Sequence, residues 1–144
     1  MEPRDIALSA ARGRIGFGVL FTLLPSVAGG RLWLGPEARQ PGARLAMRAL
    51  GGRDIALGLG AVIALDRGSP VRGWLEAAAF ADAVDAVATL LAGDSIPRGK
   101  RRGAFLIAAG SAVTSALLAR ALDPPPERGE VHAPEAAATG HPSG

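Results

Sequence analysis

The stretch GAFLIAAGSAVTSALLA, residues 103–119, contains no charged residue and decides the fold class. Its residues do not alternate between apolar and polar, and it is rich in alanine and leucine, which favours a helix over a strand. Extended to Leu122, it is about 20 residues long and would span about 30 Å, the thickness of the hydrocarbon core of a bilayer. The sequence therefore predicts a transmembrane helix at 103–122.

Three similar apolar stretches precede it, and charged, turn-like segments separate all four. The predicted helices are 15–34, 45–65, 72–93 and 103–122. Because the connections are short, successive helices should be antiparallel neighbours. The predicted fold is all-α, a four-helix transmembrane bundle with up-down-up-down topology. It occupies residues 13–123, after an N-terminal arm at 1–12 and before a disordered Pro- and Gly-rich tail at 124–144.

A soluble four-helix bundle is the competing interpretation, because no charge-free run reaches the roughly 18 residues that mark a clear transmembrane helix. The stretches 45–65 and 72–93 also contain ionisable residues. These are Arg53, Asp54, Glu76, Asp82 and Asp85. A soluble amphipathic helix, however, should carry a polar face along its whole length. The first and fourth stretches have no such face, so we expect a multi-pass protein of the cell membrane.

The composition excludes several classes of function. There is no cysteine, which excludes disulfides and cysteine-ligated metals, and the two histidines, His132 and His141, lie in the tail. The formal charge of +3 comes from scattered arginines, and aromatic residues make up only 4% of the chain, which argues against nucleic-acid binding. No nucleophile lies beside a general base in the sequence. We therefore expect no enzyme activity, no metal and no cofactor.

Small residues recur at helical spacing along the apolar stretches. Gly51, Asp54, Gly58 and Ala61 fall on one stripe of the second stretch. Similar rows are Gly18, Thr22, Ser26 and Gly30 in the first stretch, and Ala104, Ala108, Ser111 and Ser115 in the fourth. Membrane helices associate through close backbone approach at such residues. Pro25 should kink the first helix.

The ionisable residues inside the second and third stretches form the candidate site. Arg53 lies two residues before the middle of 45–65, and Asp85 lies two to three residues after the middle of 72–93. In antiparallel helices these positions have the same depth. Asp82 is one turn from Asp85 on the same face, and Thr89 continues that face. We therefore predict a salt bridge from Arg53 to Asp85, Asp82 or both in the bundle interior, where charges avoid lipid.

This polar cluster has two interpretations. It is either a structural clasp that fixes the register of the helices, or the lining of a small polar cavity for a proton, an ion or a small solute. Three carboxylates, with Asp54 included, face the single cation Arg53, so one should lack a cationic partner unless Arg48 compensates. The first interpretation predicts a small non-enzymatic membrane protein, acting as an accessory or interaction subunit. The second predicts a minimal oligomeric transporter or proton-coupled channel.

A basic run lies between the third and fourth stretches. It consists of Arg98, Lys100, Arg101 and Arg102. Such a run sets membrane topology, and it also suits anionic lipid headgroups. The expected partners are thus the lipid bilayer and either a second copy of the chain or another membrane protein.

The sequence RALGGRDIALGLG at 48–60, followed by ADAVDA at 81–86, resembles a family of small four-helix bacterial membrane proteins. In that family an Arg-Asp pair opens a Gly-rich second helix, and an Asp-x-x-Asp motif lies in the third. The resemblance covers about residues 12 to 122. It implies the four-helix fold and membrane residence, and it implies no activity or catalytic residue.

Overall fold

The computed structural model describes residues 2–122, and this part of the chain is entirely helical apart from its turns. Its elements are α1 (Pro3–Leu23), α2 (Pro25–Leu32), η1 (Gly35–Arg39), α3 (Pro41–Asp66), α4 (Arg72–Leu91), η2 (Gly93–Ser95) and α5 (Arg98–Leu122). The predicted all-α fold is confirmed for these residues. The predicted tail at 124–144 lies outside them.

The N-terminal boundaries were predicted wrongly. Residues 3–12 are part of α1 and do not form the predicted arm, and no single helix covers 15–34. The backbone N–H of Glu2 donates to Asp5 Oδ2 at 3.4 Å, and proline is well suited to the first helical position. Pro25 does more than kink the helix. Leu24, just before it, leaves the α conformation (φ −123°, ψ 52°), so α1 ends and α2 begins there.

The other three long helices lie where the apolar stretches predict them, but two of them start earlier. Helix α3 begins at Pro41 instead of 45, and α5 begins at Arg98 instead of 103. Helical hydrogen bonds do not require apolar side chains, so a helix continues into its polar flanks until a turn residue stops it. The apolar stretch marks the middle of each helix and not its ends.

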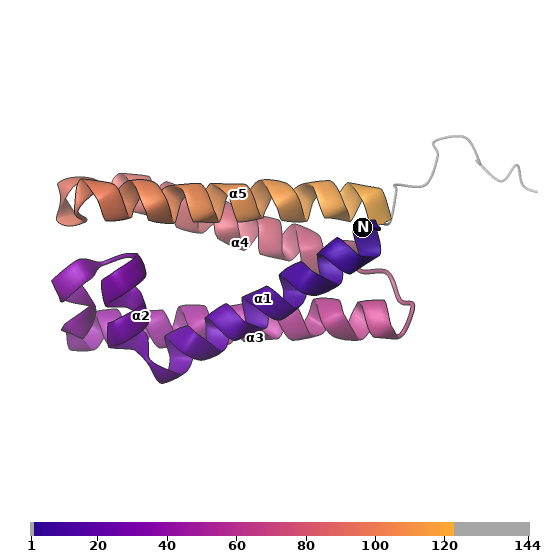
Figure 1. Cartoon of the computed structure of the whole chain (residues 1–144), viewed down its shortest axis with the longest axis horizontal. Coiled ribbons are helices and arrows are strands. Elements are labelled where there is room, and N and C mark those ends of the chain that lie inside the picture. Colours follow the sequence, from indigo (N-terminus) through magenta and orange to yellow (C-terminus); the bar gives the residue numbers. More distant parts are fainter. Residues whose placement is uncertain (1, 123–144) are drawn as a thin grey trace, which may run out of the picture.

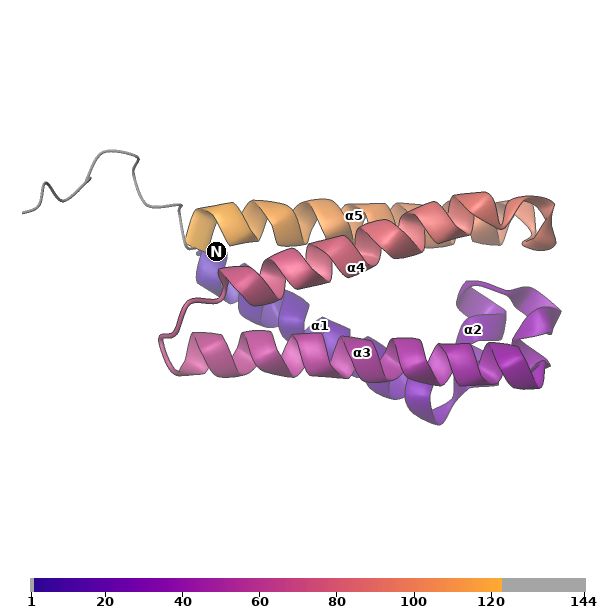
Figure 2. The ribbon, with the colours of Figure 1, turned by 180° about the vertical axis from the view of Figure 1, so that it is seen from behind.

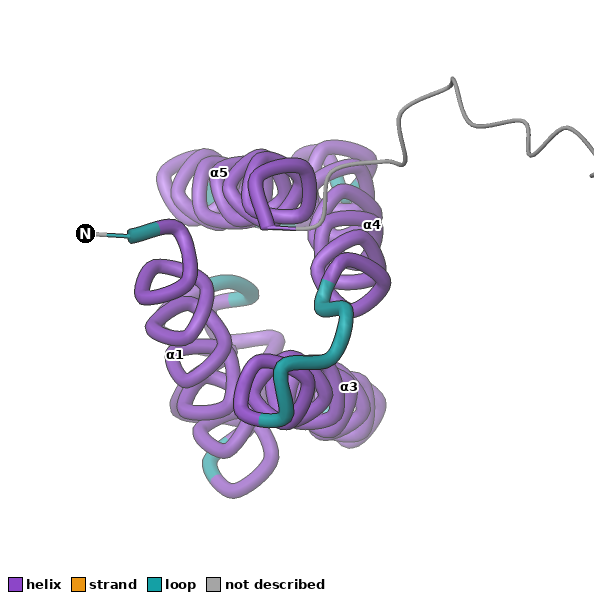
Figure 3. The backbone as a smooth tube through the Cα atoms, turned by 90° about the vertical axis from the view of Figure 1, so that its right-hand side faces the viewer, coloured by secondary structure: helices purple, strands orange, loops and turns teal. Residues whose placement is uncertain are grey.

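The four long helices form two pairs. Helix α1 packs along α3 at an incline, and α4 packs along α5, whereas contacts between the two pairs are far fewer. Successive long helices run in opposite directions, as the colours of Figure 1 and the reverse view of Figure 2 show. The end-on view in Figure 3 places the four helices around a common centre. Side chains facing this centre must therefore link the two pairs.

Glycines allow α1 and α3 to approach closely. A Cβ atom added to Gly18 would lie 2.5 Å from the carbonyl oxygen of Gly51, and one added to Gly58 would lie 2.8 Å from that of Ala11. The predicted small-residue stripe of α3, from Gly51 to Ala61, is buried at all four positions, including Asp54. Close packing of backbones at small residues is therefore confirmed for this pair of helices.

Gly51→Ala is expected to lower the free energy of unfolding by about 1–3 kcal/mol, because the new methyl group would overlap backbone atoms of Gly18 and Thr22. Gly52→Ala is the matched control on the same helix, since nothing lies within 4 Å of its Cβ position. It should stabilise the helix by up to about 1 kcal/mol. Denaturation of both variants in detergent micelles, followed by circular dichroism, measures the difference. Equal stabilities would contradict the tight α1–α3 contact.

The distribution of apolar residues is inverted relative to a soluble bundle. Alanines make up most of the buried apolar residues, whereas many large apolar side chains point outward from every long helix. Leu23, Phe80 and Leu91, for example, are 69%, 73% and 82% exposed. By length and composition, α1 and α5 could each cross a membrane, and only 22% and 17% of their most apolar windows are buried.

Candidate functional site: a buried Arg/Asp network

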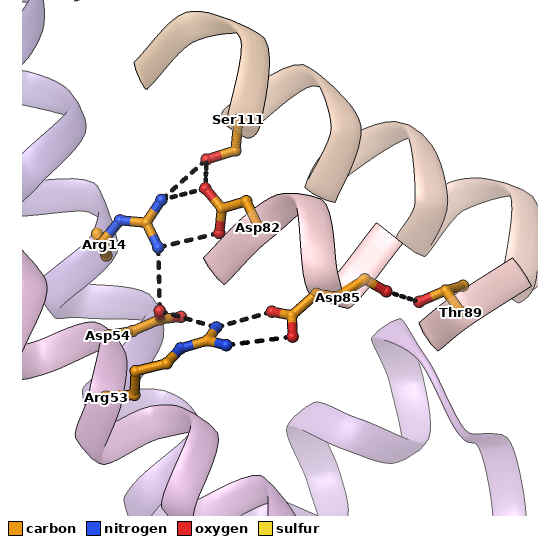
Figure 4. A network of polar contacts seen from close by, with 7 residues as sticks. All are labelled: Arg14, Arg53, Asp54, Asp82, Asp85, Thr89 and Ser111. Atoms are coloured by element: carbon orange, nitrogen blue, oxygen red, sulfur yellow. Dashed lines mark hydrogen bonds and ion pairs between the residues drawn. The ribbon is translucent and has the colours of Figure 1, made fainter. Parts of the chain in front are cut away.

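The predicted contact between α3 and α4 is present. Arg53 donates from Nη2 to Asp85 Oδ2 at 2.7 Å and from Nη1 to Asp85 Oδ1 at 3.2 Å. The planar guanidinium thus meets both carboxylate oxygens, as Figure 4 shows. Of the two partners predicted for Arg53, Asp85 is the one bound; Asp82 is held by a different residue. Matching the depths of antiparallel helices therefore identified the correct pair.

Asp54 connects this pair to the rest of the site. Its Oδ1 atom accepts from Arg53 Nη2 at 3.2 Å and from Arg14 Nη1 at 3.0 Å. The residue is only 4% exposed, because it lies on the glycine stripe where α1 crosses α3. Asp54 is therefore the carboxylate that both arginines share.

Arg14 is the residue of the candidate site that the sequence analysis did not predict. It donates from Nη1 to Asp82 Oδ1 at 3.0 Å, bonds Asp82 Oδ2 through Nη2, and donates from Nη2 to Ser111 Oγ at 3.1 Å. The apolar stretch starts at Ile15, so Arg14 lies at its edge in the sequence. Because α1 actually starts at Pro3, Arg14 lies in the middle of the helix.

Two features of the sequence could have identified Arg14 as an interior residue of the first helix. The sequence Glu2-Pro3-Arg4-Asp5 is a helix start, and the surplus of central carboxylates required a second cation. Arg48 does not provide it, since its Nε atom donates to the backbone oxygen of Thr22 at 3.4 Å. The compensating charge comes from the first helix and not from the second.

Two hydroxyl groups complete the site in different ways. Ser111 Oγ donates to Asp82 Oδ2 at 2.6 Å and so attaches α5 to the network. Thr89 is buried on the predicted face, but its Oγ1 donates to the backbone oxygen of Asp85 within its own helix, at 2.7 Å. Thr89 therefore adjoins the network without binding a charged side chain. All four long helices contribute to the network (Figure 4).

The network, defined as Arg14, Arg53, Asp54, Asp82, Asp85 and Ser111, keeps one surplus negative charge. Each carboxylate contacts at least one guanidinium, so the prediction that one would lack a cationic partner is wrong. Two arginines nevertheless face three aspartates, which gives a formal charge of −1. Asp54 Oδ2 takes part in none of the hydrogen bonds among the described residues.

A cavity of about 330 Å³ lies beside the network. Its charged lining consists of Arg14, Asp54, Asp82 and Asp85, with hydroxyl groups from α5 nearby. Its apolar lining includes the aromatic residues Phe17, Phe21, Trp33 and Trp74. The lining of the cavity is therefore amphipathic, since it combines charged and aromatic residues.

The basic run at 98–102 forms the first turn of α5 instead of a loop. Lys100 Nζ donates to the backbone oxygens of Gly30 and Arg31 at 2.8 and 2.7 Å, which satisfies carbonyls at the end of α2. Arg101 lies 3.5 Å from Asp94, and Arg98 and Arg102 are exposed. The site predicted for lipid headgroups is thus partly occupied by contacts within the protein.

No family model, no curated protein and no solved structure matches this chain, so the resemblance drawn from the motifs at 48–60 and 81–86 stays a prediction.

Proposed function

We propose that this chain is a multi-pass integral membrane protein in which α1, α3, α4 and α5 each cross the bilayer, alternating in direction. The observation that carries the proposal is the distribution of residues: most buried apolar residues are alanines, the central charged groups point inward, and many large apolar side chains are exposed. Water would drive the large side chains inward, whereas lipid exerts no such drive. A soluble bundle of this length would need a polar outer face on each helix.

The charges of α3 and α4 are compatible with this placement, because the central ones point inward and bind one another. Around them the outward positions are apolar, among them Leu59 and Ile63 on α3 and Phe80, Val84 and Val87 on α4. Near the start of α4, Arg72 and Glu76 form an exposed pair, Nε to Oε1 at 2.6 Å, close to where the membrane interface would lie. Charges in membrane helices are tolerated when they are paired in the interior in this way.

Membrane fractionation tests the proposal directly. We expect the intact protein to stay in the membrane pellet after washing with alkaline carbonate or high salt, and to be released by detergent. Peripheral proteins are removed by these washes, because their attachment is electrostatic or shallow. A soluble protein of the same cell and a known multi-pass protein serve as controls. Release without detergent would favour the soluble four-helix bundle.

Within this membrane protein, we propose that the Arg/Asp network is a clasp. It links the α1–α3 pair to the α4–α5 pair, and other contacts between the pairs are few. Paired buried charges are best attested as devices that fix register. The role that fits is non-enzymatic: an accessory or interaction protein whose apolar outer surface meets lipid and a second copy or another membrane protein. Purification in mild detergent would identify such a partner.

Transport is the second candidate function, and the cavity beside the network favours it. A clasp alone has no need of an open volume lined by three carboxylates. Intramembrane carboxylates commonly mark the pathways of ions and protons. Because four short helices enclose little space, a transporter of this size would act as an oligomer. Flux in proteoliposomes that disappears in Asp82→Asn, while the variant still folds, would support transport over the clasp.

A further inference from the structure

The cavity combines three properties that together define a class of ligand. The first is its volume of about 330 Å³, which falls within the range of about 300–1,000 Å³ that is typical of small-molecule sites. It has contributions from all four long helices and from Trp33, so it lies between the two helix pairs and is not a surface groove of one pair.

The second property is its charge. Arg14, Asp54, Asp82 and Asp85 line the cavity, and Arg53 does not. The lining therefore carries one positive and three negative groups, and the whole network, with Arg53 included, has a formal charge of −1. A monovalent cation would balance this charge, whereas an anion would increase the imbalance.

The third property is an available hydrogen-bond acceptor. Asp54 Oδ1 is bound by both arginines, while Oδ2 has no partner among the described residues. Asp54 is only 4% exposed, and it lines the cavity. A carboxylate can accept at both oxygens, so Oδ2 is suited to an N–H donor placed in the cavity. A charged donor would bind it more strongly than a neutral one.

The aromatic part of the lining is suited to an apolar body. Phe17 and Phe21 stack with their ring centroids 4.2 Å apart, and Trp33 and Trp74 also line the cavity. Aromatic faces attract cations as well as apolar groups. Ala78 and Ala108 also line the cavity, and their small side chains leave room in it for a ligand.

From these observations we propose that the cavity binds a small monovalent ammonium compound with an apolar body, whose N–H groups donate to Asp54 Oδ2 while its body packs against the aromatic lining. The inference goes beyond the clasp, because the network can hold the helices together while one of its carboxylates also accepts from a ligand. It does not require that the ligand be transported.

The test uses 2-phenylethylammonium as the probe and the full-length protein in detergent micelles. Binding is followed by calorimetry and by tryptophan fluorescence, since the chain has two tryptophans and both line the cavity. We expect saturable binding, at least about tenfold tighter than that of 2-phenylethanol, the neutral compound of the same skeleton, because a charged N–H donor binds a carboxylate more strongly than a neutral O–H donor does. Empty micelles correct for partitioning into detergent.

Three variants make the test specific. Asp54→Asn leaves Arg14 with Asp82 and Arg53 with Asp85, so it should fold and lose binding at least about tenfold. Ala108→Leu narrows the cavity without changing a charge, and it should also lose binding. Asp94→Asn removes an 89% exposed carboxylate away from the cavity and should bind normally.

The outcomes separate this inference from the proposed membrane function. Absence of saturable binding, equal binding of the amine and the alcohol, unchanged binding by a folded Asp54→Asn, or unchanged binding by Ala108→Leu would each overturn it. If Asp54→Asn does not fold, Ala108→Leu and the alcohol decide. Resistance to carbonate extraction is independent of all these results, so either proposal can fail alone.

Discussion

Arg14→Leu is expected to destabilise the protein by about 3–5 kcal/mol, more than any other single change in the network. The substitution removes the cation that binds Asp82 through both of its oxygens and that also binds Asp54 and Ser111. The Arg14 side chain is 11% exposed, against 31% for Arg53, so water can replace less of what is lost. A buried carboxylate without its partner bears the full desolvation cost.

Arg98→Leu is the matched control, because Arg98 is an exposed arginine at the start of α5, outside the apolar stretch 103–119 and away from the network. Its loss should leave stability within about 0.5 kcal/mol, as for most surface substitutions. The double variant Arg14→Leu, Asp82→Leu should recover much of the loss, since Arg53 still contacts Asp54 and Asp85. Unfolding in micelles by sodium dodecyl sulfate measures all three. An Arg14→Leu protein as stable as Arg98→Leu would show that Arg14 contributes nothing to the clasp.

The contrast between Arg53 and Arg14 shows what the sequence could predict about this site. Two long apolar stretches joined by a short turn must run antiparallel, so the relative depth of Arg53 and Asp85 follows from counting residues. The contact of Arg14 with Asp82 joins residues 68 positions apart on helices that are not consecutive. Residue counting does not determine which nonconsecutive helices face each other, because that depends on how the two pairs pack.

The helix boundaries were limited by a different physical factor. Hydropathy indicates where a helix can contact lipid, but it does not indicate the residue at which helical hydrogen bonding begins. Pro3 and Pro41 start α1 and α3 within polar sequence, and α5 includes the basic run from Arg98. The apolar stretch begins at Ile15, within α1, so hydropathy places Arg14 outside the predicted helix. Proline at the first turn marks the true starts of both α1 and α3.

The interior of this bundle gives a reason for its polar network. Close approach at Gly18, Gly51 and Gly58 fixes the α1–α3 pair through backbone contact. Between the pairs, the cavity leaves less apolar contact, and most of the buried apolar residues of the bundle are alanines with little area to bury. Directional bonds between guanidinium and carboxylate groups can fix the relative position of the pairs where shape alone does not.

The triple variant Arg53→Leu, Asp82→Leu, Asp85→Leu should be much more stable than Arg53→Leu alone. The single substitution leaves Asp85 without a cation among the described residues, and we expect it to cost about 3 kcal/mol, less than Arg14→Leu because Arg53 is more exposed. The triple variant removes one positive and two negative groups together. It leaves Arg14 and Asp54 as a neutral pair at 3.0 Å. Removing a complete buried ion cluster in favour of apolar groups is often neutral or stabilising.

This result separates the two roles of the network when stability and function are measured on the same protein. Unfolding in micelles gives the stability, and flux in proteoliposomes or copurification with a partner gives the function. A clasp predicts that the triple variant regains stability and keeps its function, because leucines can hold the helices as well as ion pairs do. A working site predicts regained stability with lost function, because leucine cannot exchange a proton or bind a cation. A triple variant as unstable as Arg53→Leu would contradict both, since the cost would then come from packing around residues 53, 82 and 85 and not from their charges.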